Sequence, residues 1–267
     1  MSTDTRAPVA PFTIAISLKM YFGRARTIAW CDEVGHLAAT HPAVQAGDVE
    51  LVVLPTFPAI APARHALLGS PVQVGAQDLW TEDVGAFTGE VSGAELAEIG
   101  CTFVEVGHAE RRRIFGETDN LVGAKVVAAL RNGLVPIICV GETTRGPAGD
   151  AADECLTELD RVLAPARNVR SVGRIVVAYE PQWAINAPAP APVTHIATVC
   201  GRLNAALAGD PSFPQSRSIY GGSAGPGLLT ALGGDVRGLF LGRFAHDPQA
   251  LAKILDETLL LKEASAC

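Results

Sequence analysis

Three side chains of types that transfer protons stand far apart in the sequence, each directly after an apolar run. Glu180 follows "RIVVAY", His108 follows "FVEVG" and Lys19 follows "FTIAISL". A carboxylate that is partly withdrawn from water is suited to act as a general base. An imidazole at a helix start tends to stay neutral and can donate a hydrogen bond to a developing enolate oxygen, and an ammonium group adds positive charge there. Together they predict proton transfer beside a carbonyl group.

Each of the three also has a structural explanation when it is taken alone. A glutamate or lysine at a strand end is often a solvated rim residue, and a histidine at that place often caps a helix. The catalytic interpretation gains weight only if the fold brings all three to one face. The elements around them therefore decide between the two interpretations.

The apolar runs are short and nearly continuous, which is typical of parallel strands covered on both faces. Between them lie stretches with helical spacing, such as 194–207 and 247–260, the latter with Asp247 as its N-cap and Pro248 in its first turn. Eight such strand–helix units in 267 residues predict an α/β fold, a single (β/α)8 barrel. The expected strands are 12–20, 49–56, 72–78, 103–108, 135–142, 174–181, 218–223 and 238–243.

The composition fits one large domain. Apolar residues make up 48% of the chain and charged residues 18%, enough for a sizeable core. We expect one domain over residues 1–267, with 1–10 as a loose tail, and we interpret the proline-rich stretch 187–193 as a long loop within the sixth unit. The first residues lack an apolar signal core and no run is long enough to span a membrane, so we expect a cytoplasmic protein with no membrane partner.

Charge and cysteine usage exclude further classes. The net charge of −7 argues against a nucleic-acid partner, which favours a basic face. A small anionic substrate would need a local positive site. The six cysteines are scattered without Cys-x-x-Cys spacing, so we expect neither a disulfide framework nor a metal site.

In a barrel of this kind the active site lies at the carboxyl ends of the strands. Polar residues at those ends are therefore candidates, and we expect them to converge. They are Lys19, Gln77, His108, Glu142, Glu180, Ser223 and Arg243.

Several motifs resemble the triosephosphate isomerase family, in the family's order and over essentially the whole chain. They are "GAQD…GAFTGEVS", "VEVGHAERRRIFGETD", "IICVGET", "AYEPQWAI" and "IYGGSAGPG". The resemblance implies a homodimeric barrel that moves a proton between adjacent carbons of a small phosphorylated sugar through an enediolate, without a cofactor.

The resemblance also implies roles for individual residues. Glu180 would be the base, His108 the electrophile and Lys19 the electrostatic anchor. Glu110 would support the Lys19 and His108 region, and Thr88 would reach the neighbouring subunit's site. The phosphate donors would be Gly222, Ser223 and Gly242, while Cys139 matches a buried family cysteine that is best explained by packing.

The sequence departs from the family mainly around the substrate. The family's asparagine before the lysine is Ser17, and the serine after the histidine is Ala109. The second glycine of a phosphate-facing pair is Arg243, which would add a long side chain and charged hydrogen bonds worth roughly 1.5–3 kcal/mol each. The sixth loop has Asn186 at a glycine position and several prolines, so we hypothesise that this lid closes through a different C-terminal hinge.

These departures favour a substrate with one more carbon. Ser17 opens space near the reacting carbons, whereas Arg243 fills the phosphate end. Family members that isomerise erythrulose phosphates are similar at these places. We therefore predict conversion of L-erythrulose 1-phosphate to D-erythrulose 4-phosphate, a step of erythritol catabolism. Two alternatives stay open: a triosephosphate isomerase of glycolysis, and a catalytically silent phosphate-binding barrel in which Arg243 is a surface residue paired with an acid.

Overall fold

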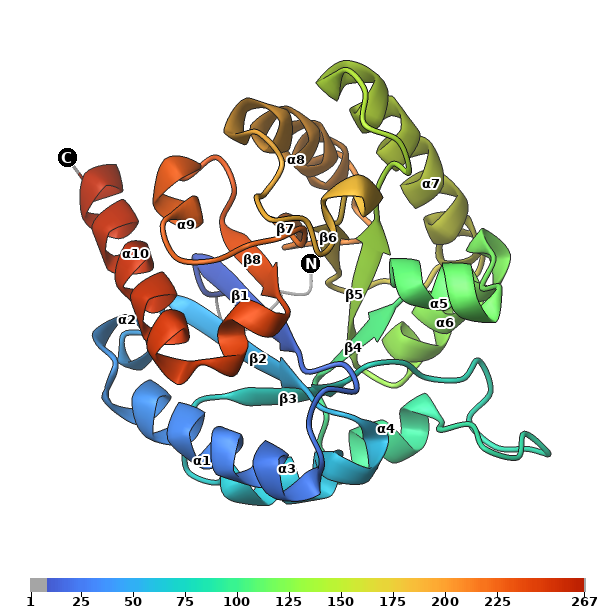
Figure 1. The fold of residues 1–267 in the computed structure, drawn as a ribbon. Coiled ribbons are helices and arrows are strands. Elements are labelled where there is room, and N and C mark those ends of the chain that lie inside the picture. Colours follow the sequence, from blue (N-terminus) through green and yellow to red (C-terminus); the bar gives the residue numbers. More distant parts are fainter. Residues whose placement is uncertain (1–8, 267) are drawn as a thin grey trace, which may run out of the picture.

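Eight parallel strands close into a barrel in the order β1 to β8 (Figure 1). The computed structural model describes residues 9–266. The strands are β1 (Phe12–Ser17), β2 (Val49–Leu54), β3 (Gln73–Ala76), β4 (Phe103–Val106), β5 (Val135–Val140), β6 (Val176–Tyr179), β7 (Arg217–Tyr220) and β8 (Gly238–Leu241). Each lies within an expected strand except β7, which begins one residue earlier, at Arg217. The predicted closed barrel is confirmed; most of the expected loose tail, 1–8, lies outside the described residues.

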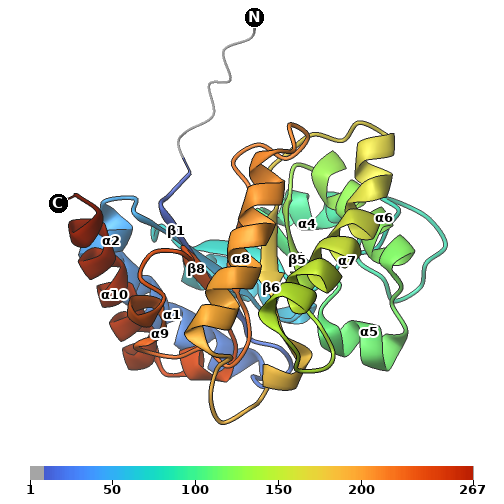
Figure 2. The same ribbon diagram turned by 90° about the horizontal axis from the view of Figure 1, so that it is seen from above.

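Helices cover the outside of the barrel (Figure 2). They are α1 (Arg24–Thr40), α2 (Pro42–Gln45), α3 (Ile60–Ala66), α4 (Gly93–Ile99), α5 (Ala109–Phe115), α6 (Asp119–Arg131), α7 (Ala148–Asn168), α8 (Val193–Ala208), α9 (Leu228–Ala231) and α10 (Pro248–Ala266). Short 3-10 turns η1 (Phe57–Ala59), η2 (Gln182–Ala184) and η3 (Arg243–His246) follow β2, β6 and β8. Asp247 Oδ1 accepts from the Gln249 amide at 3.0 Å, as expected for the start of α10.

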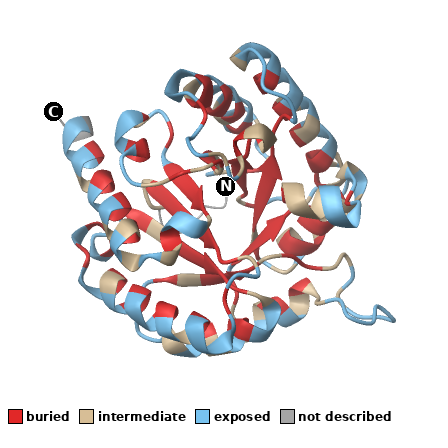
Figure 3. Cartoon of the chain, in the orientation of Figure 1, coloured by how far each residue is buried: buried red, intermediate tan, exposed pale blue. Residues whose placement is uncertain are grey.

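The strands are buried on both faces, while the helices other than α5 bury residues on one face (Figure 3). One apolar cluster fills the inside of the barrel, and a larger one lies between the strands and the helices. The barrel closes where β1 pairs with β8. Gly238 lies at that seam, where a Cβ atom would collide with the Thr13 carbonyl, so only glycine allows this close approach.

The segment between η2 and α8 and the character of the helices bear on the expected proline-rich loop and on membrane spans. Residues 187–192 form a loop between η2 and α8, as expected, whereas Val193, the last residue of the expected loop, is the first residue of α8. Among residues 9–266, no helix combines the length and the apolar character that crossing a membrane requires.

Candidate active site

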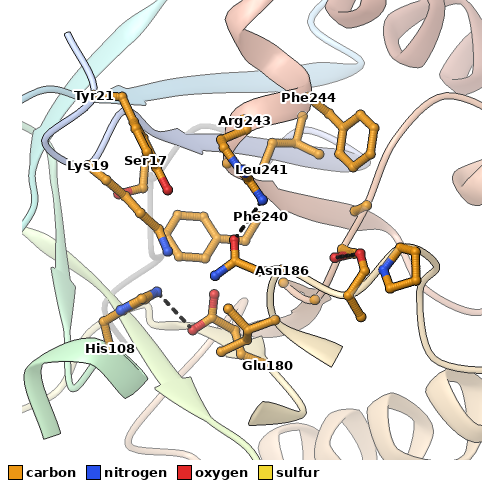
Figure 4. Close-up of a pocket in the computed structure, with 18 residues that line it drawn as sticks. Ser17, Lys19, Tyr21, His108, Glu180, Asn186, Phe240, Leu241, Arg243 and Phe244 are labelled. Carbon is orange, nitrogen blue, oxygen red and sulfur yellow. Dashed lines mark hydrogen bonds and ion pairs between the residues drawn. The ribbon is translucent and has the colours of Figure 1, made fainter. Parts of the chain in front are cut away.

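A cavity of about 350 Å³ opens at the carboxyl ends of the strands (Figure 4). It brings together residues from β1, β4, β6, β7 and β8 and the loops after them. Of the residues predicted for the site, those that line it are Ser17, Lys19, His108, Glu180, Asn186, Gly222, Ser223, Gly242 and Arg243. The expected convergence is therefore observed for these nine.

Glu180 directly follows β6 and points into the cavity (Figure 4). The residue is 5% exposed, and its side chain packs against Gly221, where an added Cβ would lie 2.6 Å from the Glu180 Cγ. Burial and the nearby Glu105 together raise the pKa of Glu180 to about 8, against the opposing effect of Lys19. A carboxylate with such a pKa is a stronger base than an exposed glutamate.

His108 is the N-cap of α5 and faces Glu180. Its Nδ1 accepts a hydrogen bond from the Glu110 amide at 3.1 Å, so Nε2 carries the proton in the neutral ring. Nε2 lies 3.4 Å from Glu180 Oε2, and neither atom has a hydrogen-bond partner within residues 9–266. Burial, together with Lys19, lowers the pKa of His108. The ring is therefore a neutral donor aimed at the cavity.

Lys19 has a left-handed backbone, with φ 46°, which places its side chain over the cavity. Its Nζ lies 2.9 Å from Glu110 Oε1, the support predicted for Glu110. Burial alone would lower the pKa of Lys19, but Glu110, Glu180 and Glu105 raise it. The Gln77 amide donates to the Lys19 and Leu54 carbonyls at 3.1 and 2.9 Å, so Gln77 orients this backbone.

The two glycines predicted to bind phosphate differ in the space beside them, because the Tyr220 hydroxyl occupies the place of a Cβ atom at Gly222. Gly242 has open space where a Cβ atom would be. At Ser223 the donors are already engaged by the loop after β6, because Oγ donates to the Ala187 carbonyl at 2.8 Å and the amide donates to Ala184 at 3.2 Å. Ser223 thus joins the loop after β6 to the loop after β7.

Arg243 lines the cavity from the end of β8. Its Nη2 donates to Asn186 Oδ1 at 3.0 Å (Figure 4). Asn186 has φ 59°, the left-handed conformation that favours glycine and tolerates asparagine. The partner of Arg243 is thus an amide rather than the acid that a degenerate surface pairing would require.

Two of the polar residues at strand ends, Gln77 and Glu142, do not line the cavity, so their expected convergence on it is not observed. Glu142 accepts from Trp183 Nε1 at 2.8 Å and from the Tyr179 hydroxyl at 3.0 Å and lies 3.2 Å from His195. The prediction that Glu142 converges on the site was wrong, because these partners bury Glu142 beneath the loop after β6. Thr88 is exposed on the long loop between β3 and α4, outside the cavity.

The five cysteines among residues 9–266 are buried. Cys139 is buried inside the barrel, where desolvation raises its pKa. Cys31, Cys101, Cys155 and Cys200 are also buried and free, and Cys267 lies outside the described residues. Within residues 9–266, no cluster of histidine, cysteine and carboxylate side chains could hold a metal ion.

The sequence interpretation missed Glu105. This residue lies in β4 and accepts from the Ser17 hydroxyl at 2.8 Å. Its signal was present in the sequence, as the one charge in the strand "FVEV". Several apolar residues that line the cavity were also missed, among them Ile185, Phe240 and Phe244.

Comparison with known proteins decides the family. A model described as triosephosphate isomerase matches residues 12–258. The L-erythrulose-1-phosphate isomerase of Pectobacterium atrosepticum is 51% identical over 249 residues, covering 93% of this chain and 96% of that protein. The chain belongs to the triosephosphate isomerase family.

Other members of the family are also similar to the chain. The triosephosphate isomerase of Symbiobacterium thermophilum is 40% identical over 214 residues, covering 77% of this chain and 82% of that protein. The L-erythrulose-1-phosphate isomerase of Mesorhizobium japonicum is 38% identical over 218 residues, covering 78% and 83%. The resemblance of the motifs is confirmed, and the protein is a sugar-phosphate isomerase of this family.

Proposed function

We propose that the protein interconverts L-erythrulose 1-phosphate and D-erythrulose 4-phosphate. The observation that carries this choice is that Ser17 and Arg243 both line the cavity that Glu180 and His108 share. The 51% identity to a protein named L-erythrulose-1-phosphate isomerase supports it. The reaction would belong to erythritol catabolism.

The site supplies the groups for each proton transfer. The Glu180 carboxylate takes the proton from carbon 3, the carbinol carbon beside the ketone, and the electron pair forms the double bond between carbons 2 and 3. His108 Nε2–H protonates the former ketone oxygen. The hydroxyl on carbon 3 then returns a proton to His108, while Glu180 delivers its proton to carbon 2, so the ketone moves to carbon 3. No cofactor takes part.

Electrostatics favour the enediolate over the ketose. Lys19, the only cation of the catalytic trio, is held by Glu110 at 2.9 Å and faces the oxygens where negative charge develops. Fixed donors and charges in a site that excludes water act more strongly than they would in bulk solvent. His108 stays neutral and can therefore exchange protons between the two oxygens without forming a stable imidazolium.

The phosphate group would lie between the loops after β7 and β8. Gly222 and Gly242 line the cavity there, Gly242 leaves open space, and Arg243 adds a guanidinium at the same end. A guanidinium can bind phosphate through two parallel hydrogen bonds. Asn186 holds Arg243 at 3.0 Å, so phosphate binding would couple directly to the loop after β6.

A triosephosphate isomerase is the second candidate. The same trio would serve dihydroxyacetone phosphate, and relatives such as the Symbiobacterium protein carry that name. Ser17 and Arg243 then have no evident purpose.

The test is the conversion of four substrates, namely dihydroxyacetone phosphate, glyceraldehyde 3-phosphate and both erythrulose phosphates, by the wild type and by Glu180→Gln. We expect the tetrulose phosphates to be preferred, and the substitution to lower kcat at least about 100-fold, since general-base catalysis contributes 10²–10⁴-fold. Glu263→Gln, an exposed carboxylate on α10, is the matched control and should act as the wild type does. Preference for the trioses would support the second candidate, and no turnover would mean a silent barrel.

We also propose a cytoplasmic homodimer in which Thr88 reaches the neighbouring subunit's site. In support, the loop that carries Thr88 protrudes from the barrel between β3 and α4 (Figure 1), and it exposes Val84 and Phe87. Light scattering would give the mass, and a monomer at micromolar concentration would contradict the proposal.

A further inference from the structure

Glu105 places a buried carboxyl group inside the barrel, next to the inner apolar cluster. Phe103 of the same strand belongs to the inner apolar cluster, and the alternation of side chains along a strand turns Glu105 to the same side. Glu105 is 3% exposed. A buried carboxyl group is costly unless it has a hydrogen-bond partner.

That partner is Ser17, whose Oγ donates to Glu105 Oε2 at 2.8 Å. His108 Nε2 lies 4.0 Å from Glu105 Oε1, which is too far for a hydrogen bond. Ser17 lines the cavity whereas Glu105 does not. Glu105 therefore acts on a bound substrate through Ser17.

The hydrogen bond to Glu105 fixes the direction in which the Ser17 hydroxyl hydrogen points. A serine hydroxyl has one hydrogen and two lone pairs. When its hydrogen points inward to an ionised Glu105, only lone pairs remain for the cavity. Ser17 then accepts hydrogen bonds from a ligand and does not donate them.

The cavity has two ends, and Ser17 lies at the end opposite the phosphate side. Ser17 and Lys19 lie on the side of the cavity that is nearer to His108, and Phe244 lies on the far side of Arg243 from them (Figure 4). With phosphate near Gly222 and Gly242, the substituent of the carbon that loses its proton extends toward Ser17. In a tetrulose phosphate this substituent is a hydroxymethyl group, and in a triose phosphate it is a hydrogen.

We propose that Ser17 accepts a hydrogen bond from the terminal hydroxymethyl group of the four-carbon substrate, and that Glu105 is the positioning residue that makes Ser17 an acceptor. This inference rests on the proposed function and assigns it a specificity determinant. A site built to pair a substrate hydroxyl discriminates against the analogue that lacks it, because its own polar group is left unpaired.

Whether the Ser17 hydroxyl accepts or donates a hydrogen bond in the cavity depends on the charge of Glu105. Burial raises the pKa of Glu105 to about 7, while Ser17 and Lys19 lower it. Once protonated, Glu105 can donate to Ser17, whose hydrogen is then free to turn to the cavity. The other ionisable groups that act on Glu105 or lie close to it are Glu110, Asp78, Glu180, His108 and Cys139.

The first experiment uses the wild type and needs no substitution. The ratio of kcat/KM for L-erythrulose 1-phosphate to that for dihydroxyacetone phosphate is measured from pH 5.5 to 9. Ionisations that both reactions share, those of Glu180, His108 and the phosphate, largely cancel in this ratio. We expect it to rise severalfold through about pH 7, and Glu105→Gln, which cannot ionise, to make it independent of pH. The same pH dependence in Glu105→Gln would overturn the proposal.

The second experiment is a double-mutant cycle on the same ratio at pH 8.5. Ser17→Ala and Glu105→Met should each lower it about 10-fold, as expected for one lost hydrogen bond, and the double variant should be no worse than either. If the loss in the double variant equals the product of the two single losses, Ser17 and Glu105 act independently and the proposal is overturned. Val104→Ala, a buried change in the same strand, is the matched control and should lower stability but not the ratio. If Glu105→Met fails to fold, the pH dependence of Glu105→Gln still decides.

Failure of the inference and failure of the proposed function give different results. A wild type that does not turn over tetrulose phosphates overturns both. A wild type that prefers them, with a ratio insensitive to Glu105→Gln, Glu105→Met and Ser17→Ala, overturns only the role of Ser17 and Glu105.

Discussion

Two neighbouring side chains in the cavity have pKa values shifted in opposite directions by burial. Desolvation disfavours the charged form of each group, so it raises the pKa of the Glu180 carboxyl and lowers that of the His108 imidazole. The 3.4 Å contact between them thus joins a strong base to a neutral donor. Such a divergence is typical of paired acid and base groups in enzymes.

The pH dependence of the reaction follows from Glu180. Because the ionised carboxylate is the active form and its pKa is raised to about 8, kcat/KM should fall about tenfold per pH unit well below pH 8. Initial rates with the preferred substrate across pH 5.5 to 9.5 measure this. A rate that stays constant down to pH 6 would show that the free enzyme holds Glu180 ionised and would contradict the assignment.

Arg243 should distinguish substrates at the phosphate end. Replacing it by glycine removes the guanidinium and the 3.0 Å contact to Asn186. We expect Arg243→Gly to lower kcat/KM for the tetrulose phosphate about 10-fold or more and to affect the triose less, because charged hydrogen bonds contribute roughly 1.5–3 kcal/mol. Arg170→Gly, at an exposed arginine in the turn after α7, serves as the control. Equal losses on both substrates would mean that Arg243 binds phosphate without selecting the sugar.

At the scale of elements, the sequence predicted the strands well because the fold is built from local regularities. Buried parallel strands give continuous apolar runs, and the carboxyl ends of all strands in a barrel meet at one face. Lys19, His108 and Glu180 could therefore be placed together without any structure.

The remaining features depend on contacts between elements. Glu142 stands at a strand end like the others, but Trp183 and Tyr179 bind it below the loop after β6. Glu105 lies within a strand, and only the distance to Ser17 shows that it faces the site. A position along a strand predicts a face, whereas a partner on another strand can be known only from the fold.

A hydrogen bond holds the C-terminal end of the loop after β6 in place. The Ala191 amide donates to the Tyr220 hydroxyl at 2.9 Å in a buried setting, and this contact is where we propose that the proline-rich loop hinges. Tyr220→Phe should lower stability by about 1–3 kcal/mol because a buried amide loses its partner, and it should change kcat more than KM. Urea unfolding and steady-state kinetics measure the two effects. Lower stability with unchanged kinetics would contradict the hinge.

At the scale of the whole molecule, the burial that makes Glu180 a strong base also lowers the stability of the folded protein at high pH. The pKa of Glu180 is raised in the folded state, so its contribution to stability is full below the ordinary pKa of a glutamate and is lost as the pH rises through about 8. The folded protein must therefore hold an unfavourable buried charge at the pH where it is most active. Stability and activity oppose each other at this residue.

Glu180→Gln should consequently be more stable than the wild type at pH 9 and nearly equal to it at pH 4.5. The difference in unfolding free energy at pH 9 should be on the order of a few kcal/mol, from about 1.4 kcal/mol per unit of pKa shift. Thermal or urea unfolding at both pH values measures it. A variant that is less stable than the wild type at pH 9 would show that Glu180 is stabilised as an anion in the fold.

The most direct test of the proposed substrate is a competition in one solution. L-erythrulose 1-phosphate and dihydroxyacetone phosphate are mixed at equal concentration with the wild-type protein, and both products are followed by phosphorus NMR, so that the ratio of initial rates equals the ratio of kcat/KM. We predict faster conversion of the tetrulose phosphate, by at least about 10-fold. Faster conversion of the triose would contradict the assignment and identify the protein as a triosephosphate isomerase.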